Sequence, residues 1–108
     1  SWDLCSIIGN LVDNAFEAVT ENKNHKQVGL ELKLEDNNYV IYVYNNGPKL
    51  SSKEKLKIFE PGFTTKESIG RGYGLYLVKK LVENYHGNIQ VFSNDKTTFI
   101  VSIPLKEK

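Results

Sequence analysis

Residues 28–44, VGLELKLEDNNYVIYVY, indicate the fold class, because they predict two strands joined by a tight turn. From Val28 to Glu35 a leucine or valine alternates with a glycine or a charged residue, and this period of two is typical of a half-buried strand. Asp36, Asn37 and Asn38 favour a turn. Residues 39–44 are rich in aromatic and β-branched side chains, so they predict a second strand that returns antiparallel to the first.

The sequence on either side of this hairpin predicts helices and a second hairpin. Apolar residues recur at helical spacing from about Asp3 to Asn22 and again from Tyr73 to Tyr85, where His86 and Gly87 end the pattern. The expected apolar stripe of the first helix consists of Leu4, Ile8, Leu11, Ala15 and Val19. The other expected elements are a short helix near Lys53–Phe59, a loop over Glu60–Gly72, and a closing hairpin of Ile89–Ser93 and Thr97–Pro104. This order predicts an α+β fold in which helices cover one face of an antiparallel-leaning sheet.

The composition limits the classes of function. The 108 residues suit one domain, expected to span residues 1–108. The net charge is +1 and the basic residues are scattered, so neither a nucleic-acid interface nor membrane contact is expected. Cys5 is the only cysteine, which excludes a disulfide framework and fits a reducing, cytoplasmic compartment. No apolar run reaches the roughly 18 residues of a membrane span. The first residue is Ser1 rather than Met, which predicts a fragment of a longer protein. The fragment is expected to be monomeric.

The first helix has an unusual polar face. Asn10, Asn14 and Glu17 fall within a narrow arc of the helix, opposite the apolar stripe. Asparagine is a poor helix former, so two asparagines one turn apart call for a reason. Their amide oxygens suit a hard cation such as Mg²⁺, and their NH₂ groups suit phosphate oxygens. The alternative is an ordinary solvated face.

Two further segments carry candidate ligand groups. Before the second long helix, Gly70, Gly72 and Gly74 alternate beside Lys66 and Arg71, so backbone N–H groups and positive charge could meet an anion there. A flexible surface loop is the alternative, and the spacing matches neither a dinucleotide fingerprint nor a GxxxxGK[ST] phosphate loop. The second segment, residues 44–48, places a polar pair and a glycine at the end of a buried strand, although a plain turn explains it equally well.

The order and spacing of these segments together resemble the GHKL ATPase superfamily, and within it the sensor histidine kinases. The matching blocks are GNLVDNAFEA (9–18), NNGP (45–48), IFEPGFTTK (58–66), GRGYGLYLVKKLVENYHG (70–87) and TTF…P (97–104). The block FEPGFTTK resembles a phenylalanine motif found in the kinases and not in gyrases or Hsp90. The wording is most similar to the branch that contains citrate and dicarboxylate sensors, with the peptide quorum sensors nearby. The resemblance implies a two-layer α/β sandwich whose sheet is mixed but mostly antiparallel.

The resemblance also implies a Mg-ATP site between the first helix and a mobile lid. Asn14 would ligate Mg²⁺, and Asn10 would meet the metal or the phosphates. Phe59 and Lys66 would border the lid, and Arg71 would reach the γ-phosphate. Asn10, Lys66 and Arg71 are therefore the expected catalytic residues.

The remaining nucleotide contacts follow from the same resemblance. Thr98 would lie near the adenine, because it precedes Pro104 by six residues as in the family pattern. The other implied positions are Asn45, Gly47, Thr65, Gly70, Gly72, Tyr73, Gly74 and Leu75.

Two departures from the family pattern bear on chemistry. At the position of Asn10, the hydrolytic members of the superfamily have a glutamate that activates water, and an amide cannot act as a general base. The aspartate that accepts the adenine amino group is Asn45 here, which keeps an acceptor oxygen without its charge, and the second glycine of that motif is Lys49. These departures predict that bound ATP is not hydrolysed by water and that adenine is bound less tightly.

The resemblance implies that the phosphorylated histidine lies on a dimerisation domain of the same protein and that a response regulator receives the phosphoryl group. His25 follows the first helix and His86 ends the second, and neither lies in anything like a phosphoacceptor helix. Two alternative functions stay open. One is a degenerate ATP-binding or scaffolding module without catalysis, and the other is a GHKL hydrolase or protein-serine kinase.

Overall fold

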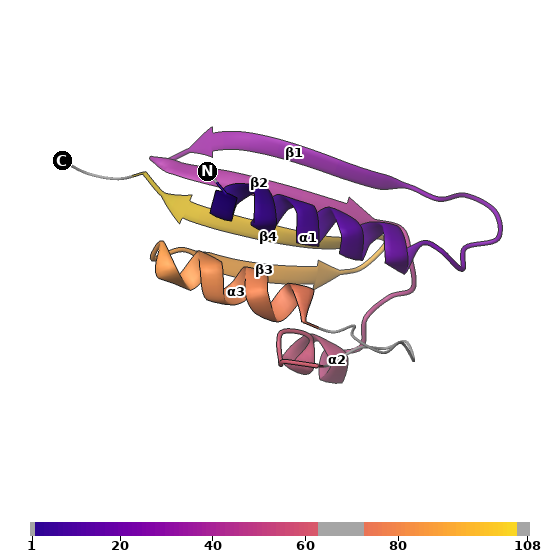
Figure 1. The fold of residues 1–108 in the computed structure, drawn as a ribbon. Coiled ribbons are helices and arrows are strands. Elements are labelled where there is room, and N and C mark those ends of the chain that lie inside the picture. Colours follow the sequence, from indigo (N-terminus) through magenta and orange to yellow (C-terminus); the bar gives the residue numbers. More distant parts are fainter. Residues whose placement is uncertain (1, 63–72, 106–108) are drawn as a thin grey trace.

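Four antiparallel strands form one sheet in the computed structural model, which describes residues 2–62 and 73–105. The elements are α1 (Trp2–Ala18), β1 (Val28–Glu35), β2 (Asn38–Asn45), α2 (Ser52–Lys57), α3 (Gly74–Asn84), β3 (Asn88–Ser93) and β4 (Thr97–Pro104). The strand order is β1-β2-β4-β3, and α1 and α3 lie together on one face of the sheet (Figure 1). The predicted α+β fold with helices on one face is therefore confirmed.

The turn between β1 and β2 is as tight as the sequence predicts. Asp36 and Asn37 both have positive φ, at 50° and 65°, which matches the right-handed twist of a two-residue hairpin. Glu35 pairs with Asn38, and the register continues to Val28 opposite Asn45. This register carries the end of β2 back toward the C-terminal end of α1.

The core lies between the sheet and the two long helices. Its largest fully buried side chains include Phe99, Ile7, Leu11, Ile41 and Val78. The buried stripe of α1 runs through Ile7, Leu11 and Ala15, whereas Leu4 is exposed and Ile8 only partly buried. The stripe is thus rotated slightly from the expected one, because α1 packs against α3 as well as against the sheet. Helix α1 also ends at Ala18, four residues before the predicted end at Asn22. Backbone hydrogen bonds of 3.0–3.2 Å form turns in the segment that follows.

Two contacts fix the C-terminal end of α3. The hydroxyl of Tyr85 donates a 2.6 Å hydrogen bond to Asp3 Oδ2 at the start of α1, and this bond raises the pKa of Tyr85 above its usual value. His86, not Gly87, takes the left-handed conformation with φ 63°, while the N–H of Gly87 donates to the carbonyl of Val82 at 2.9 Å. Gly87 is required for another reason, since a Cβ there would lie 2.3 Å from the Ser102 carbonyl oxygen.

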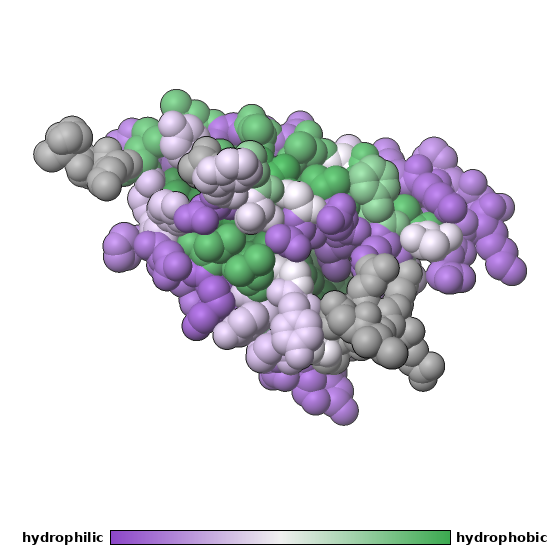
Figure 2. Space-filling model, viewed as in Figure 1, coloured by the Kyte–Doolittle hydropathy of each residue, from purple (hydrophilic) through white to green (hydrophobic). Residues whose placement is uncertain are grey.

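Strand β1 departs from the expected half-buried strand. Its leucines Leu30, Leu32 and Leu34 face the helix side of the sheet, opposite Val43, Ile41 and Tyr39, yet they are 45%, 61% and 65% exposed. Figure 2 shows apolar surface along the upper edge of the view, where β1 lies. Helices α1 and α3 together are too narrow to cover all four strands. The predicted alternation of β1 is therefore correct, but the predicted burial of its leucines is wrong.

Candidate nucleotide site between α1 and α3

The Asn10 side chain on α1 is oriented toward the start of α3. Its Nδ2 donates a 2.8 Å hydrogen bond to the carbonyl of Ser6, one turn earlier on α1. Its Oδ1 points the other way, and a Cβ built on Gly74 would lie only 2.9 Å from this oxygen. Glycine at position 74 therefore lets the first residue of α3 approach the amide oxygen of Asn10.

The N-terminus of α3 lies on the side of α1 that carries Asn10. Tyr73 is the N-cap residue and makes no side-chain capping hydrogen bond, and the first turn of α3 has no acidic residue. Backbone N–H groups of a first helical turn have no partner within the helix, and the helix dipole adds partial positive charge. Oxygen anions are stabilised at such an end.

Asn14 lies one turn further along the same side of α1. It is half-buried, and its amide makes no hydrogen bond within the part of the chain that the structure describes. An amide side chain carries two N–H donors and an acceptor oxygen, which suit phosphate oxygens and a metal ion. Asn10 and Asn14 thus present oriented oxygen and amide groups beside the N-terminus of α3.

Three buried polar residues lie side by side at one end of the sheet. Asn45 is 2% exposed at the end of β2, and it pairs across the sheet with Thr97, which pairs in turn with Ser93. The hydroxyls of Ser93 and Thr97 are 2.7 Å apart, and Ser93 Oγ accepts a 2.8 Å hydrogen bond from the N–H of Leu50. Polar groups of this kind at the inner end of a core can bind the edge of a flat, polar ring.

Thr97, and not Thr98, lies beside Asn45. Successive residues of a strand point to opposite faces, and Thr97 shares the buried face with Phe99, whereas Thr98 pairs with Tyr44 on the outer face. The buried residue beside Asn45 is therefore Thr97, and the predicted Thr98 lies on the other face of β4. The alternation of buried residues along β4 was the signal for Thr97, since Phe99 and Val101 predict the inner face. Ser93 gave no signal in the sequence.

Hydrogen bonds around Asn46 and Gly47 hold the end of β2 in place. The N–H of Gly47 donates to Asn45 Oδ1 at 2.7 Å. Asn46 Oδ1 accepts from the N–H of Gln27 at 2.9 Å and from Asn22 Nδ2 at 3.1 Å. The Asn45 side chain therefore faces inward, whereas the Asn46 side chain bonds this turn to the segment after α1.

Gly47 also lies against the C-terminal end of α1, and this contact predicts a loss of stability on substitution. A Cβ at position 47 would lie 2.4 Å from the Ala18 carbonyl oxygen, so Gly47→Ala must displace backbone and should lower the free energy of unfolding by about 1–3 kcal/mol. Gly9→Ala is the matched control. Its Cβ meets nothing within 4 Å inside α1, so it should raise stability by about 0.5–1 kcal/mol. Urea unfolding of both variants measures this, and equal effects would contradict the assigned contact.

The structure describes three of the remaining predicted site residues, and the other five lie outside the described ranges. Leu75 is buried in the core, so only its backbone faces the α3 end of the site, while Tyr73 is exposed. Phe59 packs edge-on against Phe99, with ring centroids 6.2 Å apart, on the side of the sheet that carries β3. The predicted residues Thr65, Lys66, Gly70, Arg71 and Gly72 lie outside the described residues.

Comparison with known proteins gives the family. Residues 2–107 match the model of the histidine kinase-, DNA gyrase B- and HSP90-like ATPases. This chain belongs to that family. Within the family it is similar to sensor histidine kinases: a probable C4-dicarboxylate sensor kinase of Halalkalibacterium halodurans is 36% identical over 96% of this chain, and the sensor protein CitS of Bacillus subtilis is 42% identical over 97%.

Solved structures of ATPase domains from histidine kinases agree with this assignment. The catalytic domain of histidine kinase ThkA superposes with a TM-score of 0.80 and 33% identity, over 94% of this chain and 66% of that one. The mycobacterial sensor kinase MprB has a TM-score of 0.82 at 22% identity, over 98% of this chain and 74% of that one, which supports the fold alone. The chain spans about 20% of the length of the curated relatives named above. Within residues 2–62 and 73–105, no helix is long and apolar enough to cross a membrane.

Proposed function

We propose that this ATPase domain binds Mg-ATP and donates the γ-phosphoryl group to a histidine on a separate dimerisation domain of the same protein, in two-component signalling. The observation that carries the proposal is the Asn10 amide, which is bonded to the Ser6 carbonyl through Nδ2 and has its oxygen next to Gly74, the first residue of α3. An oriented oxygen and a helix N-terminus that face each other suit a metal-bound chain of phosphates.

In this proposal, different residues bind the metal, the phosphates and the adenine of the nucleotide. Asn14 ligates Mg²⁺, and Asn10 meets the metal or the phosphates. The N–H groups at the start of α3 bind phosphate oxygens. Asn45 and Thr97 face the adenine, and Lys66, Gly70, Arg71 and Gly72 are assigned to the phosphates by family resemblance alone. Mg²⁺, when bound, neutralises charge on the phosphates and holds them in line.

The chemical step requires positioning rather than a base. The histidine nitrogen forms a bond to the γ-phosphorus while the bond to the bridging oxygen breaks and ADP leaves. Asn10 cannot take a proton from water, so water bound beside the γ-phosphate is not activated. The domain should therefore keep ATP intact until a histidine is presented. The phosphoryl group then passes to a response regulator, and the domain acts in the cytoplasm.

The Asn10 assignment predicts very low ATP hydrolysis by the isolated domain. Calorimetry with ATP and Mg²⁺ should detect binding, while the release of phosphate should stay near background. Asn10→Glu supplies a carboxylate where the amide oxygen now lies, and it should raise the release of phosphate by about tenfold or more. Asn10→Gln, which adds length without a base, is the control.

The same two measurements decide between the alternatives. Absence of ATP binding would favour a scaffolding module, for which the uncharged acceptor Asn45 is the specific argument. Brisk hydrolysis by the unmodified domain would favour a GHKL hydrolase. Acid-labile, alkali-stable phosphate on the full-length protein after incubation with labelled ATP is the positive result that the kinase function requires.

A further inference from the structure

The two edges of the sheet differ in how they are protected. Strand β1 carries Glu31, Lys33 and Glu35, and charged side chains on an edge discourage pairing with another chain. Strand β3, NIQVFS, has no charged residue and no proline. Its outer side pairs with no other strand within residues 2–62 and 73–105. Strand β3 therefore presents an unprotected row of backbone N–H and C=O groups.

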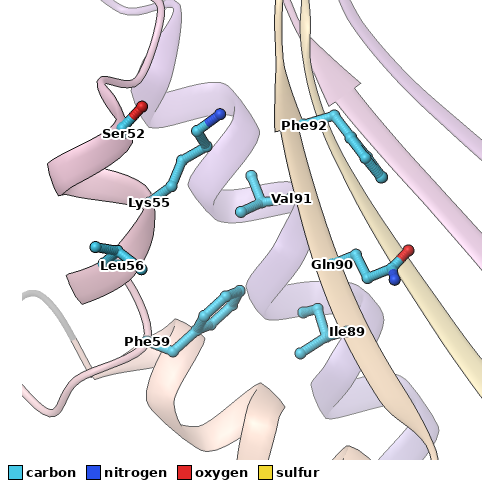
Figure 3. Close-up of a pocket in the computed structure, with 8 residues that line it drawn as sticks. All are labelled: Ser52, Lys55, Leu56, Phe59, Ile89, Gln90, Val91 and Phe92. Atoms are coloured by element: carbon cyan, nitrogen blue, oxygen red, sulfur yellow. The ribbon is translucent and has the colours of Figure 1, made fainter.

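A groove of about 530 Å³ runs beside this edge, between α2 and β3. Figure 3 shows Ile89 and Val91 pointing from β3 toward α2, while Gln90 and Phe92 point to the opposite face of the strand. Phe59 closes the end of the groove nearest α3, and Leu56 lines the α2 side. Leu56 is 83% exposed, and α2 has no buried residue, so Leu56 has no function in the core.

The α2 side of the groove is positively charged. Lys53, Lys55 and Lys57 lie on α2, and Lys55 lines the groove. The acidic residue of α2, Glu54, accepts a 2.8 Å hydrogen bond from the N–H of Ser51 as part of a capping box, which directs its carboxylate to the helix start. The charged residue that lines the groove is therefore Lys55, a cation that favours an acidic occupant.

We propose that the groove between α2 and β3 binds an extended polypeptide segment, with acidic and apolar residues on one face, that adds to β3 as a further strand. Backbone hydrogen bonds to β3 supply affinity, and side chains at every second position of the segment enter the groove. The apolar members contact Leu56, Phe59 and Val91, and acidic members at the ends meet the lysines of α2. A helix or a small apolar molecule would leave the backbone of β3 unpaired, which is why a strand is the occupant that fits.

The test uses two synthetic peptides and the 108-residue domain. The acidic probe, acetyl-Glu-Thr-Val-Thr-Val-Thr-Glu-amide, places both valines and both glutamates on one face of a strand. The basic probe replaces the glutamates with lysine. We expect the acidic probe to bind below about 1 mM, to shift the amide resonances of β3, and to give strand-to-strand contacts with it in NMR spectra. The basic probe should bind at least tenfold more weakly.

Three variants locate the binding. Leu56→Asp should weaken the acidic probe at least tenfold, and Lys55→Glu should reverse the preference between the two probes. Leu32→Asp changes another exposed leucine, on the opposite edge of the sheet, so the affinity should stay the same. Two further probes carry proline at the central threonine or at the valine after it. Only alternate residues of a strand bond to one neighbour, so one of the two probes loses a donor to β3 and should not bind.

Several results would overturn the proposal. These are no binding near 1 mM, equal binding of both probes, full affinity in Leu56→Asp, a bound helical peptide, or resonance shifts confined to β1. Of the residues predicted for the ATP site, the groove shares Phe59, whereas Asn10, Asn14 and Asn45 do not line it. Failure of the probe to bind would therefore leave the proposed kinase function intact.

Discussion

Asn14→Ala is expected to weaken the binding of Mg-ATP by about 100-fold, because it removes the proposed ligand of the metal from α1. The same change should leave the fold intact. Asn14 is half-buried, so truncation of its side chain opens no cavity in the core. It makes no hydrogen bond among the described residues, so truncation leaves none of them without a partner. Alanine also has the higher helix propensity. Calorimetric titration of ATP with Mg²⁺, together with thermal unfolding, measures both effects.

The metal dependence makes this expectation specific. Without Mg²⁺, the wild-type domain and Asn14→Ala should bind ATP with nearly equal affinity, since the lost contact is to the ion. Asp13→Ala, an exposed position one residue earlier on α1, is the matched control and should change neither measurement. A marked fall in the melting temperature of Asn14→Ala, or an unchanged response to Mg²⁺, would show that Asn14 is structural.

The architecture could be predicted from the sequence because each element carries its own local signal. Strict alternation in β1 and the Asp36-Asn37 turn fix the first hairpin, and a hairpin determines its own register. The burial of β1 could not be predicted in this way. Alternation shows which face of a strand is apolar, but the position of α1 over β2 decides whether that face is covered.

The candidate site shows the same division between local and tertiary information. Helical periodicity correctly placed Asn10 and Asn14 on one side of α1. The approach of Gly74 to Asn10, and the groove beside β3, arise from packing between distant segments and have no local signature. The choice between Thr97 and Thr98 depends on information of another kind. Two adjacent threonines fit the same motif, and only the phase of Phe99 within β4 distinguishes them.

The second large effect is expected at Asn45, where two replacements should act in opposite directions on ATP. Asn45→Leu removes the proposed acceptor of the adenine amino group. It also removes the partner of the Gly47 N–H, which is bound at 2.7 Å. The variant should therefore bind ATP at least about tenfold more weakly and lose about 1–3 kcal/mol of stability, because a donor loses its acceptor beside the core. Binding of tripolyphosphate with Mg²⁺ should stay within about twofold of the wild-type value, since the base contact alone is lost.

Asn45→Asp keeps the shape and the acceptor for Gly47 while it adds a negative charge. A carboxylate is the stronger acceptor for an amino group, so ATP should bind up to about tenfold more tightly. The site is 2% exposed, and desolvation of the new charge opposes this gain. Thr97 is the cross-strand neighbour of Asn45, so its hydroxyl can reduce that penalty by donating to the carboxylate while it accepts from Ser93 Oγ. GTP, which lacks the amino group at the same ring position, should not share the increase, and equal changes for ATP and GTP would place the base away from Asn45.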